Sequence, residues 1–278
     1  MGERPSKGVE VALISGIHGD ELHGPHALAR VNARLTKAAR RSVLVEPFAN
    51  PPALSARTRT AAPDHADMNR QFGAKATDGA TSTRERAMAL WDRIAHVDVL
   101  VDIHSGGRHE MIPHARLSGS GDRELPLISA MGLEYAVRYR RLPKGLLMTA
   151  GRRTGMASFG VEVGAGQEVR PELVELTVGA IWSLLAHLEL VPGAKTSAET
   201  RLLDILGTRR ATRDALFERS TAIGVEVEVG QRLGVLHDPY SGRQRDVVAP
   251  AAGLLVSALT SGPTIAGEKL VEVALPIV

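Results

Sequence analysis

At 278 residues, the chain is long enough for one large domain or for a main domain with a smaller appendage. Its hydrophobic content of 44% and its charged content of 23% are typical of a globular protein with a sizeable core. No stretch approaches the roughly 18 apolar residues of a membrane helix, and the short apolar run near the N-terminus predicts no signal peptide. The chain has no cysteine, which excludes disulfides, thiolate nucleophiles and cysteine-based zinc sites, and the cytoplasm is the expected location.

The net charge of +3 and the sequence pI of about 9.4 raise the question of a nucleic-acid partner. The arginines are scattered, however, the longest basic cluster spans only residues 37–41, and aromatic residues at 3% leave little to stack on bases. We therefore expect no nucleic-acid partner. The arginines suit an anionic small substrate instead, because the planar guanidinium matches a carboxylate.

Strands and helices alternate along the first two thirds of the chain. The apolar patterns predict strands at 9–15, 42–48, 98–103 and 158–164, and helices at 25–41, 82–97 and 171–190. Ser82 and Glu85 have the spacing of a capping box at the start of the second helix. A polar loop from 50 to about 81 is long for a compact domain, and loops of this length are often functional.

This alternation predicts an α/β fold with a mostly parallel or mixed sheet flanked by helices. Residues 191–200 read as a linker, and the short alternating runs beyond it predict a small all-β domain. We therefore expect a catalytic α/β domain at 1–192 and a C-terminal β domain at 200–278. Ligands of open α/β sheets gather past the carboxyl ends of the strands, where His18 and His104 are expected, with Glu162 close to another strand end.

A hydrolytic zinc site without cysteine needs about three His or carboxylate ligands, an open position for water and a nearby carboxylate. His18 and Glu21, three residues apart on a strand-to-helix turn, can supply two ligands, and His104 at a neighbouring strand end can supply the third. Asp102 or the region of Ser105 could orient an imidazole by hydrogen bonding.

Four motifs follow one another along the chain: "SGIHGDE", "NPPALSARTRTAAPDHADMNRQFG", "VDIHSGG" and "FGVEVGAGQ". In this order they resemble the motifs of the succinylglutamate desuccinylase and aspartoacylase family, a branch of the zinc carboxypeptidase fold. The C-terminal segments "GVEVEVGQRLGVLHDP" and "VVAPAAGLL" are also similar to that family, so the resemblance covers nearly the whole chain.

The resemblance implies one zinc ion per chain, held by His18, Glu21 and His104. It also implies that Glu162 is the general base, which takes a proton from a zinc-activated water and then protonates the departing amine. The site of two histidines and one glutamate is the arrangement known from zinc carboxypeptidases.

Arginines in the predicted loop and beyond it are given substrate roles by the same resemblance. Arg59 would stabilise the oxyanion, and the motif spacing favours it over Arg57. Asn69 and Arg70 would hold a substrate carboxylate. Arg152 and Arg153 precede Glu162 by ten and nine residues. Near this distance from the glutamate, the aspartoacylase branch carries an arginine that contacts the acyl-chain or side-chain carboxylate of the substrate, so the resemblance implies such a contact for Arg152 or Arg153.

The tetrapeptide Val-Glu-Val-Gly occurs twice, at 161–164 and at 227–230. Alternating Val and Glu usually form a half-exposed strand with its charges in water, which we expect for Glu226 and Glu228. Glu162 belongs to the predicted α/β sheet, whose strands are usually covered on both faces, and this position favours a catalytic role.

Together these patterns predict a zinc-dependent amide hydrolase that removes an N-acyl group from a small N-acyl amino acid or a related carboxylate. A metallocarboxypeptidase for short peptides and a non-catalytic zinc or ligand binder are the alternatives. The segment "VVAPAAGLL" also resembles biotinyl and lipoyl carriers, but no lysine follows it before Lys269, so a lid or a homo-oligomer contact is the expected role of the tail.

Overall fold

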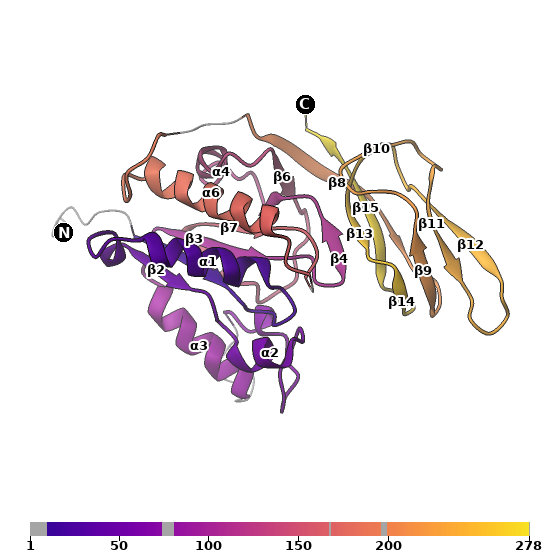
Figure 1. Ribbon diagram of the computed structural model, residues 1–278, viewed down its shortest axis with the longest axis horizontal. Coiled ribbons are helices and arrows are strands. Elements are labelled where there is room, and N and C mark those ends of the chain that lie inside the picture. Colours follow the sequence, from indigo (N-terminus) through magenta and orange to yellow (C-terminus); the bar gives the residue numbers. More distant parts are fainter. Residues whose placement is uncertain (1–9, 74–80, 167, 196–198, 278) are drawn as a thin grey trace.

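The computed structural model describes residues 10–73, 81–166, 168–195 and 199–277. Residues 1–9, 74–80, 167, 196–198 and 278 lie outside these ranges. They include parts of both predicted domains, of the predicted 9–15 strand, of the predicted loop, of the "FGVEVGAGQ" motif and of the predicted linker. The described residues form an eleven-stranded mixed sheet flanked by helices and a separate four-stranded antiparallel sheet (Figure 1). The predicted α/β class is confirmed.

Four parallel strands form one end of the large sheet, in the order β7-β3-β1-β2. Every residue of β1, β3 and β7 is buried, because helices cover both faces and leave these strands no contact with water. The bounds of these strands are β1 (Val11–Ser15), β2 (Val43–Glu46), β3 (Val99–His104) and β7 (Ala157–Glu162).

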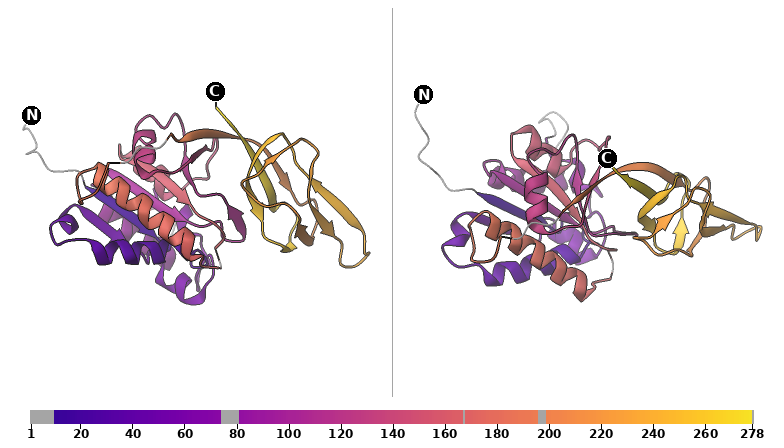
Figure 2. Two further views of the ribbon diagram at one scale, coloured as in Figure 1. Left: turned by 45° about the horizontal axis from the view of Figure 1, so that its top comes forward. Right: turned by 90° about the horizontal axis from the view of Figure 1, so that it is seen from above.

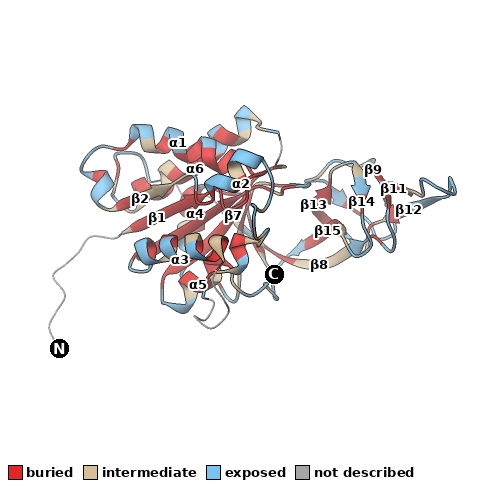
Figure 3. Cartoon of the chain, turned by 90° about the horizontal axis from the view of Figure 1, so that it is seen from below, coloured by how far each residue is buried: buried red, intermediate tan, exposed pale blue. Residues whose placement is uncertain are grey.

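Helices pack on both faces of this part of the sheet (Figure 3). One face carries α1 (His23–Arg34), α4 (Leu125–Met131) and α6 (Pro171–His187), and the other carries α3 (Ser82–Ile94) and α5 (Leu147–Arg153). The loop between β2 and α3 contains α2 (Pro51–Ala56) and the 3-10 turn η2 (Met68–Arg70), while η1 (Ala39–Arg41) precedes β2.

Several helix ends differ from the prediction: α1 begins at His23, α3 ends at Ile94 and α6 ends at His187. The first helix ends at Arg34 instead of running to residue 41, because Leu35 is extended and the Thr36 hydroxyl accepts the N–H of Ala39, which starts a separate 3-10 turn. At α3, Thr81 is the N-cap and accepts the N–H of Arg84, whereas Ser82 lies inside the helix.

The large sheet continues into the C-terminal β region, residues 199–277. Strand β8 pairs in parallel with β6, β15 pairs with β8, and β13 pairs with both β15 and β4. The same sheet thus runs through both predicted domains, and the boundary between them stays a prediction. The strands that make this connection are β4 (His109–Met111), β5 (His114–Leu117), β6 (Tyr135–Arg138), β8 (Arg201–Arg210), β10 (Glu226–Val227), β13 (Gly253–Leu259) and β15 (Lys269–Pro276).

The smaller sheet lies beyond this connection, at the end of the molecule away from the helices (Figure 2). Its order is β12-β11-β9-β14, with a separate apolar core between it and the large sheet. The turn at residues 238–242 joins β11 to β12, and its Asp238 side chain accepts the N–H groups of Tyr240 and Ser241. The bounds are β9 (Ala215–Arg219), β11 (Arg232–His237), β12 (Gln244–Val248) and β14 (Gly262–Thr264).

In the described part of the chain, no helix has the length and apolarity needed to cross a membrane.

Candidate metal and catalytic site

The turn after β1 places His18 and Glu21 at the carboxyl edge of the large sheet. Its position is fixed by a close approach to α2, since the N–H of Gly19 donates to the carbonyl of Thr58 at 3.0 Å. A Cβ on Gly19 would lie 1.8 Å from the carbonyl oxygen of Ala53, so only glycine fits there. The turn therefore lies close against α2, and it carries Glu21 to within 2.8 Å of His104 at the end of β3.

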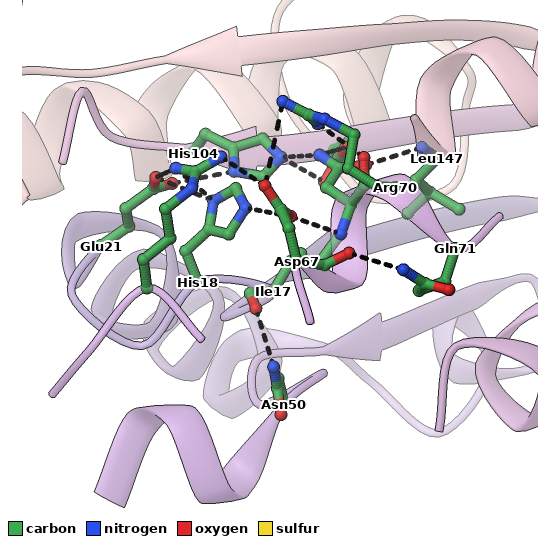
Figure 4. Close-up of polar contacts among 12 residues, drawn as sticks. Ile17, His18, Glu21, Asn50, Asp67, Arg70, Gln71, His104 and Leu147 are labelled. Carbon is green, nitrogen blue, oxygen red and sulfur yellow. Dashed lines mark hydrogen bonds and ion pairs between the residues drawn. The ribbon is translucent and has the colours of Figure 1, made fainter. Parts of the chain in front are cut away.

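His18, Glu21 and His104 converge on one point, and all three are buried. The Nδ1 atom of His18 lies 2.8 Å from Oε1 of Glu21, and Nδ1 of His104 lies 2.8 Å from Oε2 (Figure 4). One candidate ligand atom from each residue lies within 4.8 Å of the others. In the described ranges, this is the group of His, Asp and Glu side chains that could hold a metal ion.

A second carboxylate lies behind each imidazole. Nε2 of His18 is 3.1 Å from Oδ1 of Asp67, and Nε2 of His104 is 3.0 Å from Oδ1 of Asp102. Histidines that bind metals usually donate their other ring N–H to such a group, which fixes the ring and the tautomer. The donor set of two imidazoles and one carboxylate is that of catalytic zinc sites. These residues therefore fit a zinc ion.

The charges of the three candidate ligands depend on one another. Burial acts to raise the pKa of Glu21, but the neighbouring His18 and His104 charges and their hydrogen bonds hold it well below its usual range. Burial acts to lower the pKa of His104, but Asp102 and Glu21 raise it well above its usual value. Without a metal, the group is thus held together as ion pairs, and a cation would replace the protons of the imidazoles.

Glu162 lies at the end of β7, in register with His104 on β3. It is buried, and burial is the main cause that raises the pKa of its carboxyl group. Glu162 and His104 line a cavity of about 190 Å³ together with His18 and Glu21. The structure therefore brings the four residues singled out from the sequence to one cavity.

The predicted loop residues Arg59, Asn69 and Arg70 also line this cavity. The Arg59 guanidinium lies 2.9 Å from the Asp67 carboxylate and 3.4 Å from the Glu21 carboxylate. The Arg70 guanidinium lies 3.8 Å from the Asp67 carboxylate and donates to the Asn69 carbonyl at 2.7 Å. The Asn69 amide nitrogen is 3.0 Å from Nε2 of His104, and its oxygen accepts the N–H of Leu147. Asp67 and η2 thus hold the three side chains over the candidate ligands.

The other arginines considered from the sequence lie elsewhere. Arg57 is exposed, in the left-handed conformation at the end of α2. The Arg152 guanidinium lies 3.5 Å from Glu124 and 3.2 Å from the Ser118 hydroxyl, and it is not among the residues that line the cavity. Arg153 is exposed.

Two cationic residues that the sequence did not assign to the site do line the cavity. Arg116 comes from β5, and Lys269 comes from β15 of the C-terminal β region. No local pattern points to either, because their approach depends on the pairing of β5 with β7 and of β15 with β8. His23, by contrast, is buried away from the candidate ligands, with its ring nitrogens 3.1 Å from the Ser105 hydroxyl and from the Arg170 N–H.

The sequence profile of the succinylglutamate desuccinylase/aspartoacylase catalytic domain matches residues 7–188. The chain belongs to this family. One relative, the N-alpha-acetyl-L-2,4-diaminobutyric acid deacetylase of Halomonas elongata, is 30% identical over 247 residues, which are 84% of this chain and 71% of that protein. The names of the family and of this relative denote enzymes that remove acyl groups from small N-acyl amino acids.

Solved structures show the same desuccinylase/aspartoacylase fold. The product-bound ectoine utilization protein EutE (DoeB) from Ruegeria pomeroyi has a TM-score of 0.86 at 24% identity, over 96% of this chain and 86% of that chain. A succinylglutamate desuccinylase/aspartoacylase from Rhodobacter sphaeroides has a TM-score of 0.87 at 24% identity, over 98% of this chain and 87% of that chain. The similarity extends through the C-terminal β region.

Proposed function

We propose that this protein is a zinc-dependent amide hydrolase that removes the N-acyl group of a small N-acyl amino acid or a related carboxylate. The observation that carries the proposal is the convergence of His18, Glu21 and His104 beside Glu162 on one cavity. The name of the Halomonas elongata relative, a deacetylase of an N-acetylated amino acid, supports the same reaction.

His18, Glu21 and His104 would hold the zinc ion. When bound, zinc would supply Lewis-acid chemistry, which polarises a carbonyl group and makes water acidic enough to ionise near neutral pH. Asp67 and Asp102 keep the Nε2 sides of the imidazoles engaged, so that both Nδ1 atoms face Glu21 and the centre of the group.

Glu162 would move the proton. Its carboxylate takes a proton from the attacking water and passes it to the nitrogen of the departing amine. Burial raises the pKa of this group, which makes it a stronger base than an exposed glutamate and a usable acid in the second step. Arg59 is placed to stabilise the negative charge that develops on the carbonyl oxygen, and such a donor contributes about 3 kcal/mol in comparable sites.

The charges around the cavity favour a substrate with a carboxylate. Four of its lining residues are basic, Arg59, Arg70, Arg116 and Lys269; the carboxylates that pair with two of them, Asp67 with Arg59 and Glu272 with Lys269, do not line the cavity. The lining carboxylates are Glu21 and Glu162, which the metal and the proton transfer would occupy. Asn69 and Arg70 would bind the free carboxylate of the amino acid. A cationic side chain, as in a diaminobutyrate derivative, would meet no spare carboxylate among these lining residues.

The experiment is a metal analysis followed by an activity screen. The purified protein should contain or bind about one zinc ion per chain, and the zinc-loaded protein should hydrolyse some members of a panel of N-acyl amino acids. The panel should contain acetyl and succinyl groups on amino acids with anionic, neutral and cationic side chains. Peptides belong in it too, because their cleavage in place of N-acyl amino acids would favour a carboxypeptidase.

A matched pair of variants connects the metal to the reaction. His104→Ala should lose both the zinc and the activity, whereas His237→Ala should keep both, because His237 lies on β11 and is bonded to Glu218. A zinc-loaded protein that cleaves nothing in the panel would refute the proposed function. A His104→Ala variant with full zinc content would refute the assigned ligands.

A further inference from the structure

Arg116 lies on the strand beside Glu162. Strands β5 and β7 are antiparallel, with His114 opposite Glu162 and Arg116 opposite Gly160. Arg116 and Glu162 are therefore diagonal neighbours on one face of the sheet, a distance that a long side chain can bridge. A Cβ on Gly160 would lie 3.3 Å from Cβ of Arg116, so the glycine leaves space for the arginine stem.

The Arg116 guanidinium contacts two partners, the Glu162 carboxylate and the Tyr139 ring. Nη1 donates to Oε1 of Glu162 at 3.2 Å. The guanidinium carbon lies 4.6 Å from the centre of the Tyr139 ring, which is the geometry of a cation–π contact. Tyr139 follows β6 directly and is tied to β5 by the hydrogen bond from its N–H to the carbonyl of Leu117. The ring is thus a fixed support on the far side of the arginine.

The contact with Arg116 uses one oxygen of Glu162. Among the described residues, the side-chain hydrogen bond to Glu162 ends at Oε1, which leaves Oε2 for a ligand in the cavity. A glutamate side chain has three rotatable bonds, and a base must come within hydrogen-bond reach of the proton that it takes. A charge-assisted hydrogen bond to one oxygen restricts that motion without occupying the other.

We propose that Arg116 is a positioning residue, which fixes the Glu162 carboxylate for proton transfer and is itself held in place by the Tyr139 ring. The role rests on the proposed function, in which Glu162 is the base. Arg116 does not move a proton in it. Its effect appears in the rate of the chemical step, because a shift of about 1 Å in a reacting group can lower that rate by about 100-fold.

Arg116 also lines the cavity, so a direct contact with a substrate carboxylate is the competing explanation. The two roles differ in kinetics. A residue that positions the base lowers kcat and leaves KM nearly unchanged, whereas a residue that binds the substrate equally in the ground and transition states raises KM.

The first test compares Arg116→Gln and Arg116→Lys in the zinc-loaded protein, on the N-acyl amino acid that the parent hydrolyses fastest. We expect Arg116→Gln to lower kcat by about 100-fold, with the zinc content unchanged, the protein still folded and KM within about twofold. Arg116→Lys should recover about tenfold of this loss, because an ammonium group can still donate to Oε1. A parental kcat in Arg116→Gln, or a loss confined to KM, would overturn the proposal.

The second test addresses the aromatic support. Tyr139→Leu should lower kcat by about fivefold, the size of a partly buried cation–π contact, and Tyr139→Phe should recover most of it because the ring remains. Tyr135 offers a matched control, since Arg201 lies 5.6 Å from its ring and neither residue lines the cavity. Tyr135→Leu should leave kcat unchanged. Equal effects of Tyr139→Leu and Tyr135→Leu would remove the specific role of Tyr139.

A third readout does not depend on activity. In a crystal structure of the parent, the Glu162 carboxylate should occupy one position with Oε1 on Arg116, and in Arg116→Gln it should be displaced or spread over several positions. An unchanged Glu162 in the variant would overturn the positioning role. This result decides the question even if the parent cleaves no N-acyl amino acid, which would refute the proposed function separately.

Discussion

The two copies of Val-Glu-Val-Gly lie in opposite environments. In the first copy, at the end of β7, Glu162 is 4% exposed and Val163 is fully buried. In the second, after β10, Glu228 is exposed and Val229 is 70% exposed. The same four letters thus give a buried carboxylate where helices cover both faces of the sheet and a solvated one in the C-terminal β region. The surrounding sheet, and not the local pattern, decides what the glutamate can do.

The largest expected effect tests this pair directly. Glu162→Gln removes the candidate base and should lower kcat by about 10²- to 10⁴-fold while the zinc stays bound. Glu228→Gln makes the same chemical change in water and should leave kcat at the parental value. Steady-state kinetics and metal analysis of both variants measure the contrast. A Glu162→Gln variant with the parental rate would favour the non-catalytic zinc or ligand binder.

The second contrast concerns two carboxylate–imidazole pairs of equal length. Asp102 lies 3.0 Å from His104 in the buried group, and Glu218 lies 3.0 Å from His237 on the exposed part of the β region. Asp102→Asn should weaken zinc binding by about 10- to 100-fold, because the carboxylate orients a candidate ligand. Glu218→Gln should not change it. Competition with a zinc chelator gives both affinities, and equal affinities would argue against His104 as a ligand.

The third prediction concerns pH in the metal-free protein. The neighbouring Asp102 and Glu21 raise the pKa of His104 despite its burial, so this imidazole favours the folded state fully below its unfolded pKa of about 6.5. That stabilisation is lost as the pH rises through the folded pKa, at up to about 1.4 kcal/mol per pH unit. The difference in unfolding free energy between the parent and His104→Ala should therefore shrink above about pH 7.

Denaturant unfolding of the two metal-free proteins at several pH values measures this difference. Zinc affinity should change in the opposite direction and rise with pH, because the metal displaces protons from the imidazoles. A stability difference that grows with pH would contradict the predicted charge of the metal-free group.

The smallest expected effect is on the free energy of unfolding, and it comes from comparing a partly buried ion pair with an exposed one. Asp204 on β8 binds Arg138 through both oxygens, at 2.7 and 2.8 Å, and these hydrogen bonds lower the pKa of Asp204 to about 2. Asp204→Asn should lower the free energy of unfolding at pH 7 by about 1 kcal/mol. The effect should fade as the pH falls from about 3.9 through about 2, because the lowered carboxyl pKa stabilises the fold only while the group is ionised.

The exposed pair of Asp246 and Arg232 is the control. Both side chains are more than half exposed, so Asp246→Asn should change the stability by less than about 0.5 kcal/mol. Chemical denaturation of both variants provides the comparison. An Asp246→Asn effect as large as that of Asp204→Asn would mean that burial does not distinguish the two pairs.

The sequence predicted best where local patterns carry the information. The buried strands β1, β3 and β7 are apolar runs, and their ends placed His18, His104 and Glu162 at one edge because parallel strands end together. The prediction of the α/β class and of the family relationship is confirmed.

The sequence predicted least where distant segments pair. Arg116 lies on the four-residue strand β5, which has no periodic pattern, and its approach to Glu162 follows from antiparallel pairing with β7. Lys269 reaches the cavity from more than 100 residues away along the chain, through the pairing of β15 with β8. Such register depends on the whole sheet, so no spacing within the sequence reveals it.

The pairing of β6 with β8 has a consequence for dissecting the protein. A truncated chain that stops near residue 192 would lose β8, β13 and β15. Strand β6 would still pair with β5, but it would become an edge strand whose other side has backbone groups free to bind another chain. It would also lack the wall of the cavity that Lys269 forms. An isolated N-terminal fragment is therefore expected to aggregate and to stay inactive, even though it contains every candidate metal ligand.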